Sequence, residues 1–63
     1  MSIRVKAHKV SAGMVVNIEG EEGSWTVLSR HPKGGWWWVH RWNEQDEWQT
    51  AAAHYGSMEQ VIS

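Results

Sequence analysis

The side chains best suited to chemistry lie between Gly34 and Trp42, where the sequence reads GGWWWVHRW. This stretch holds four of the six tryptophans of a 63-residue chain, together with a histidine and an arginine. An indole ring stacks on other rings and on nucleobases, and its N–H group needs a hydrogen-bond partner when it is buried. The stretch therefore predicts either a core filled with tryptophan or a surface that recognises a partner.

Residues 36–42 alternate in the manner of a strand with two different faces. A single small sheet cannot bury both of these faces, so we expect some of the indoles to be exposed. The even-numbered positions share one face and the odd-numbered positions share the other: Trp36, Trp38, His40 and Trp42 against Trp37, Val39 and Arg41.

The interior of this chain needs large side chains, because the sequence contains no phenylalanine. A domain of this size buries only about 60% of its unfolded surface. We expect roughly three or four of the six tryptophans to be largely buried. Trp25, Trp38 and Trp48 are the expected core residues, and the expected exposed ones are Trp36, Trp37 and Trp42.

Metal binding and catalysis find little support in the sequence. The four histidines, at 8, 31, 40 and 54, show neither the His-x-His nor the His-x₃-His spacing, and there is no cysteine. No serine lies in a nucleophile elbow, and no glycine-rich phosphate loop is present. A domain this small also lacks room for a substrate pocket of its own. We therefore expect no enzymatic activity, no metal, no cofactor and no small-molecule substrate.

Charged residues occur in alternating basic and acidic blocks, with six Lys or Arg against seven Asp or Glu. A fold could gather the basic blocks beside the tryptophans, so that phosphates bind the cations while bases stack on the indoles. A net charge near zero is a weak indication of nucleic-acid binding, and it fits protein association at least as well. The basic residues expected to contact phosphates are Arg4, Lys6, Lys9, Arg30, Lys33 and Arg41.

Short alternating segments separated by glycine-containing turns predict a mainly β chain that forms one small domain over residues 1–63. The segments favour a small barrel or a strongly bent antiparallel sheet of about four or five strands. The expected strands cover 3–10, 14–18, 24–29 and 36–42, with a last edge strand at Val61 and Ile62.

Residues 43–56 allow two interpretations. Asn43 could cap a short helix within 43–55 that Gly56 would end. Alternatively, residues 43–46 form a turn and residues 47–52 return as a strand with Trp48 on one face. We favour the strand, because the sheet needs another partner.

The segment SAGMVVNI followed by SWTVLSRHPKGGWWWVHRW resembles the opening of SH3-like small β-barrel proteins. Such barrels often carry a Gly-x-Val pattern after a turn, here Gly13-Met14-Val15. The resemblance is one of layout; it extends to small bacterial and phage proteins of this build and points to no specific family. It implies contacts with proteins, peptides or nucleic acids, since folds of this kind host all three.

These observations predict a small non-enzymatic binding module that uses an exposed tryptophan-rich strand for association with a protein, either another protein or a second copy. The alternative is a nucleic-acid-binding module. Carboxylates around the exposed indoles would favour a protein or basic peptide, and basic side chains there would favour nucleic acid. The lack of cysteine and of a long apolar run leads us to expect a cytoplasmic protein that does not span a membrane. The candidate contact residues are Trp36, Trp37, Trp42, Arg41, His40, Arg4, Lys6 and Arg30.

Overall fold

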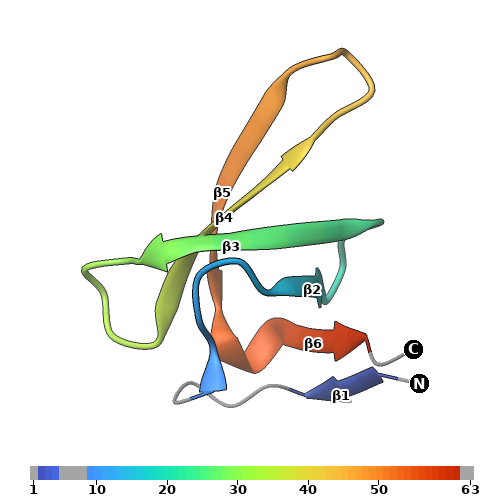
Figure 1. Cartoon of the computed structure of the whole chain (residues 1–63). Helices are drawn as coiled ribbons and strands as arrows, with labels where there is room; N and C mark the ends of the chain where they lie inside the picture. The colour runs from blue at the N-terminus through green and yellow to red at the C-terminus, as the bar shows by residue number, and fades with distance from the viewer. Residues whose placement is uncertain (1, 5–8, 62–63) are drawn as a thin grey trace.

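Antiparallel strands joined by short turns make up most of the part of the chain that the computed structural model describes, residues 2–4 and 9–61 (Figure 1). The longer strands alternate side chains between a buried and an exposed face, the pattern of a sheet with a core on one side. The elements are β1 (Ser2–Arg4), β2 (Val15–Ile18), β3 (Ser24–Arg30), β4 (Trp36–Trp42), β5 (Trp48–His54), the 3-10 turn η2 (Tyr55–Ser57) and β6 (Met58–Val61).

The strands form one sheet in the order β1-β6-β2-β3-β4-β5, and every neighbouring pair is antiparallel. This confirms the mainly β class and the antiparallel sheet. The sheet has six strands, more than the four or five expected. It is open, with β1 and β5 as its edges, so a closed SH3-like barrel is not confirmed.

The ambiguous region after Trp42 forms a turn and then a strand, as favoured above, and not a helix. Strand β5 pairs with β4 along its whole length, from Trp42 opposite Trp48 to Trp36 opposite His54. The paired backbone groups of β4 therefore outweigh the helix propensity of the three consecutive alanines in β5.

The two ends of the chain differ from the expected strands. The first strand ends at Arg4, residues 5–8 lie outside the described residues, and Val10 is a core residue outside any strand. The last strand, β6, begins at Met58 and lies between β1 and β2, so it is not an edge. Ile62 lies outside the described residues.

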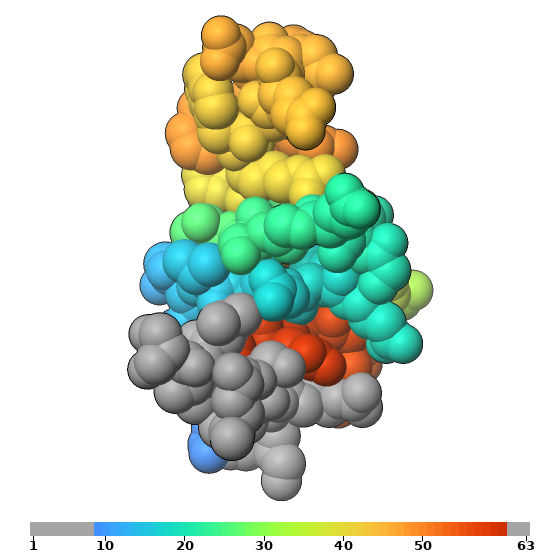
Figure 2. Space-filling view, turned by 90° about the vertical axis from the view of Figure 1, so that its right-hand side faces the viewer, coloured from blue at the N-terminus to red at the C-terminus, as the bar shows by residue number. Residues whose placement is uncertain are grey.

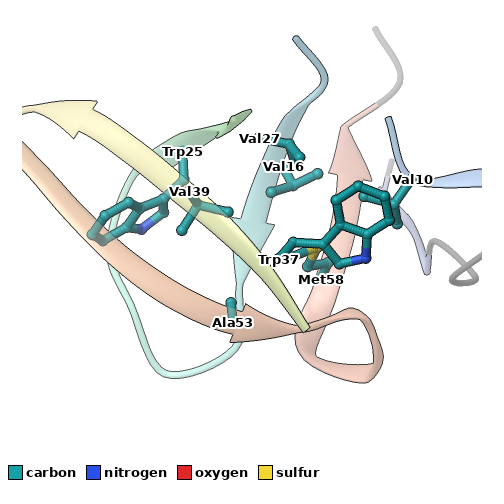
Figure 3. Close-up of a cluster of buried hydrophobic side chains, with 8 residues drawn as sticks. All are labelled: Val10, Val16, Trp25, Val27, Trp37, Val39, Ala53 and Met58. Atoms are coloured by element: carbon teal, nitrogen blue, oxygen red, sulfur yellow. The ribbon is translucent and has the colours of Figure 1, made fainter. Parts of the chain in front are cut away.

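The hydrophobic core lies on one side of the curled sheet and receives side chains from β2 through β6 (Figure 3). Cross-strand register brings these side chains together, because Val16 lies opposite Trp25 and Val27 lies opposite Val39. Among the described residues the buried hydrophobic ones are Val10, Val16, Trp25, Val27, Trp37, Val39, Ala53 and Met58.

Three of the six tryptophan assignments were wrong. Trp37, expected outside, is 6% exposed, whereas Trp38 and Trp48, expected inside, are 37% and 61% exposed. Alternation along β4 explains Trp37 and Trp38. Val39 points into the core, so Trp37 points into the core as well, and Trp38 points to the opposite face. Trp48 is exposed because it lies in the far part of the β4–β5 hairpin. Only Trp25 and Trp37 are buried, fewer than expected.

The β4–β5 hairpin extends well past the rest of the sheet. Its far end stands apart from the other strands in Figure 1, and it forms the yellow and orange projection at the top of Figure 2. Side chains at this end have few neighbours on either face, which is why Trp42 and Trp48 stay exposed.

Candidate functional site

Five aromatic side chains form a row on the outer face of the β4–β5 hairpin, the face directed away from the core. Alternation along β4 places three of them there, and the register of β4 with β5 brings Trp48 opposite Trp42. The fifth, in the turn after β3, packs against Trp38. We call this row the aromatic ladder: His31, Trp38, His40, Trp42 and Trp48.

Ring-to-ring contacts order the ladder in two groups, His31 with Trp38 and Trp48 with His40 and Trp42. The His40 and Trp48 rings are stacked, with centroids 4.4 Å apart and an interplanar angle of 11°. Trp48 meets Trp42 edge to face at 5.2 Å, and His31 lies 4.5 Å from Trp38. Such aromatic pairs contribute about 0.5–1.5 kcal/mol beyond the area they bury. The exposed rings are therefore oriented by each other before any partner arrives.

The turn between β4 and β5 fixes the far end of the ladder. The Asn43 side-chain oxygen accepts hydrogen bonds from the backbone N–H groups of Gln45 (2.9 Å) and Glu47 (3.1 Å). The Trp42 indole N–H donates to a carboxylate oxygen of Asp46 at 3.2 Å. Trp42 is 55% exposed and yet has its N–H group satisfied, so its ring face is available for contacts.

This turn is acidic, and one of its carboxylates contacts the exposed Trp42 indole. It carries Glu44, Asp46 and Glu47, all of them exposed. Because Asp46 bonds directly to the Trp42 indole, a negative charge lies against this end of the ladder.

The opposite end of β4 is basic. The turn from β3 to β4 carries Lys33, whose ammonium nitrogen lies 5.3 Å from the centre of the Trp36 ring. Arg30, at the end of β3, places its guanidinium 5.2 Å from the ring of Trp37. Trp36 is half-buried and meets His54 edge to face at 5.6 Å. Both cations of this end are therefore already placed over indole rings.

Arg41 does not join the ladder. It lies on the core side of β4, with its guanidinium 4.2 Å from the centre of the buried Trp25 ring. It donates to the Gln49 side-chain oxygen at 3.1 Å and to the backbone carbonyl of Glu22. The guanidinium thus covers Trp25, whose indole N–H has no hydrogen-bond partner in the described part of the molecule.

The structure brings together only part of the predicted contact set. Trp42 and His40 belong to the ladder, Trp36 lies half-buried at its basic end, and Trp37 belongs to the core. The side chains of Arg4 and Lys6 lie outside the described residues.

The predicted set of contact residues did not include Trp38, Trp48 or His31. The strand alternation around Val39 was a usable signal for Trp38. No local signal pointed to His31, because its contact with Trp38 depends on how the turn after β3 folds back.

Two hollows flank the hairpin. A hollow of about 500 Å³ lies between the turn before β3 and the turn after β4, and its lining includes Glu22, Arg41, Glu44 and Gln49. A second, of about 370 Å³, lies at the turn after β3 beside Trp36 and Trp37. Among residues 2–4 and 9–61, no group of three or more His, Asp or Glu side chains is arranged to hold a metal ion.

No protein-family model, no curated protein and no solved structure matches this chain. The described residues contain no helix that is long and apolar enough to cross a membrane.

Proposed function

We propose that this chain is a small non-enzymatic protein-association module, acting in the cytoplasm, whose aromatic ladder contacts a protein segment rich in Lys or Arg. The observation that carries the proposal is the contact of the Asp46 carboxylate with the exposed Trp42 indole, in a turn that also carries Glu44 and Glu47. Trp42 and Trp48 are 55% and 61% exposed, and Asp46 bonds to the indole N–H of Trp42. Indole faces and carboxylates both attract cationic side chains.

The contiguity of the His40, Trp42 and Trp48 rings supports the same proposal. Isolated exposed aromatics are common on protein surfaces, but a contiguous exposed patch marks an interaction site. Tryptophan is also among the residues most enriched in the energetic centres of protein interfaces. The ring contacts among His40, Trp42 and Trp48 lower the ordering cost that binding would otherwise carry.

Nucleic acid is the weaker candidate, because neither of the two arginines whose side chains the structure describes lies over an exposed ring of the ladder. Arg41 lies on the opposite face over Trp25, and Arg30 lies over the buried Trp37. Phosphates approaching Trp42 and Trp48 would meet the carboxylates of the turn first. Base stacking at this end would therefore work against like-charge repulsion.

Tryptophan fluorescence titration tests the proposal with three probes: a short capped peptide of alternating Lys and Gly, the same peptide with Glu in place of Lys, and single-stranded DNA. We expect the Lys peptide to change the emission in a saturable way and the other two to leave it unchanged. Binding of DNA in preference to the Lys peptide, or no response to the Lys peptide, would overturn the proposal.

Matched variants locate the contact. We expect Trp48→Ala to weaken binding of the Lys peptide by about two- to fivefold, the range of an exposed cation–π contact. Val15→Ala is the control, because Val15 is 52% exposed on the outer side of β2 and makes no ring contact with the ladder. An equal loss of affinity in both variants would mean that the Lys peptide does not bind at Trp48.

A further inference from the structure

Strand β5 is a long edge that carries none of the usual protection against pairing. Within the described residues it pairs with β4 alone. Its sequence, WQTAAAH over Trp48–His54, contains no proline, lysine or acidic residue. Natural edge strands are normally shortened, charged or interrupted to prevent association. An edge of this length without such features is suited to receive another strand.

The register of the hairpin shows which backbone groups this edge offers. The Asn43 N–H donates to the Glu47 carbonyl at 2.9 Å, and the Tyr55 N–H donates to the Gly35 carbonyl at 3.0 Å. In an antiparallel ladder the bonded pairs recur at every second residue. The odd-numbered residues of β5 therefore bond to β4. Trp48, Thr50 and Ala52 present both their N–H and C=O groups to the open edge. His54 presents only its N–H, because it is the N-cap of η2 and its C=O accepts the first bond of that turn.

A second β5 fits this edge when it runs antiparallel about a two-fold axis at Ala51. Trp48 then lies opposite His54 of the partner subunit, and Thr50 lies opposite Ala52 of the partner subunit. At the Thr50–Ala52 pairs, outward-facing N–H and C=O groups meet on both strands, and the His54 N–H faces the carbonyl of Trp48 of the partner subunit. The small side chains near the axis impose no steric barrier to the approach of the second strand.

Charge gives the strongest reason for a second copy as the occupant. Strand β5 begins beside the acidic turn that carries Glu44 and Glu47, and it ends beside the basic turn that carries Lys33. Antiparallel pairing therefore places the acidic turn of each copy near the basic turn of the other. The charges of the two turns are thus complementary between two copies when their β5 strands run antiparallel. In a parallel pair, turns of like charge would meet.

We propose that this chain forms a symmetric dimer through antiparallel pairing of β5 with β5, which joins the two sheets into one. The proposal extends the protein-association function above by naming a second copy as one partner. Because the two-fold axis is perpendicular to the sheet, both aromatic ladders lie on the same side of the dimer. Trp48 then lies beside His54 of the partner subunit, so the rings of the two copies form one continuous surface.

Sedimentation velocity from micromolar to millimolar protein tests the dimer, and charge variants test its direction. Glu47→Lys and Lys33→Glu each place like charges together in their own homodimer, so we expect each variant alone to self-associate roughly two- to tenfold more weakly. When the two variants are mixed, opposite charges meet at both ends, so the mixed dimer recovers the original affinity. Equal association of the mixture and the separate variants would overturn the antiparallel arrangement.

A backbone variant tests the edge itself. Thr50→Pro removes an N–H that points away from β4, a position where an edge strand tolerates proline. We expect this variant to be monomeric and Thr50→Ala to dimerise normally, with the circular dichroism spectra of both unchanged. A dimer that persists in folded Thr50→Pro would overturn the proposal.

The two proposals fail separately. A chain that stays monomeric over the whole concentration range overturns edge pairing, whereas binding of the Lys peptide by that monomer leaves the ladder proposal intact. A dimer that ignores the Lys peptide supports edge pairing and overturns the ladder proposal.

Discussion

The two faces of β4 put the same residue type to different uses. Trp37 and Trp38 are neighbours in the chain, yet the first is 6% exposed in the core and the second is 37% exposed in the aromatic ladder. Their surroundings differ in kind: Trp37 packs within a cluster of valines and Met58, whereas Trp38 meets the ring of His31.

This difference separates folding from recognition within one strand. The core face near Val39 supplies the apolar burial that a small domain needs, and the outer face leaves its rings accessible. The balance between buried and exposed side chains shifts further along the strand, because the pairing of β4 with β3 reaches only to His40 and the far end of the hairpin stands apart from the other strands (Figure 1). The part of β4 that pairs with β3 therefore contributes to the core, and the outer face of its far end is exposed.

The comparison of the two faces is sharpened most by removing each indole in turn. Trp37→Ala should lower the free energy of unfolding by about 3–5 kcal/mol, since it deletes a buried ring and leaves a cavity. Trp38→Ala should lower it by about 1 kcal/mol or less, since its ring is already in contact with water. Urea unfolding followed by circular dichroism measures both.

The outcome of this pair is decisive because a small domain has little stability to lose. A loss of about 3–5 kcal/mol would unfold much of the population of Trp37→Ala. Similar losses in the two variants would mean that the faces of β4 do not differ as described.

The basic turn before β4 offers a second contrast, between two adjacent glycines. Gly35 has a φ of 81°, and an added Cβ would lie 2.9 Å from the Nε2 atom of His54. Gly35→Ala should therefore cost more than about 1 kcal/mol, from the left-handed backbone alone. The added methyl group should also displace the His54 ring and disturb its edge-to-face contact with Trp36.

Gly34→Ala is the matched control for this turn. An added Cβ there meets nothing within 4 Å, and the unfolded chain loses freedom, so stability should be unchanged or rise by about 0.4–1 kcal/mol. Thermal unfolding of the two variants gives the comparison. A Gly34→Ala variant as unstable as Gly35→Ala would show that the turn differs from the one described.

The smallest expected effect lies in the acidic turn, where charge can be removed without altering shape. Asp46 has a φ of 60°, which asparagine also tolerates, and the asparagine side-chain oxygen can still accept the Trp42 N–H. Asp46→Asn should therefore change the unfolding free energy by less than about 0.5 kcal/mol. The affinity for the Lys peptide should fall by about twofold, since one bordering carboxylate is lost. Unchanged affinity would remove Asp46 from the binding surface.

Periodicity in the sequence predicted a large part of the fold. Alternation around Val39 placed the two faces of β4 correctly, glycine and proline marked the turn after β3, and β5 was correctly preferred over a helix. The assignment of individual tryptophans was less successful, because alternation divides residues into two faces but does not say which face is buried. That choice depends on β6, whose Met58 closes the core on the side of Trp37.

The chain by itself determined the period of two along its strands, the position of its turns and the opposite charges of the two turns that flank β4. These follow from local backbone preferences and from the order of residues. The tertiary structure alone decided three further properties: which indoles are exposed, that Arg41 covers Trp25 instead of flanking the ladder, and that β5 is left as an edge. Each depends on which distant strands pair and how far the sheet curls, and those contacts are between residues that the linear order does not bring together.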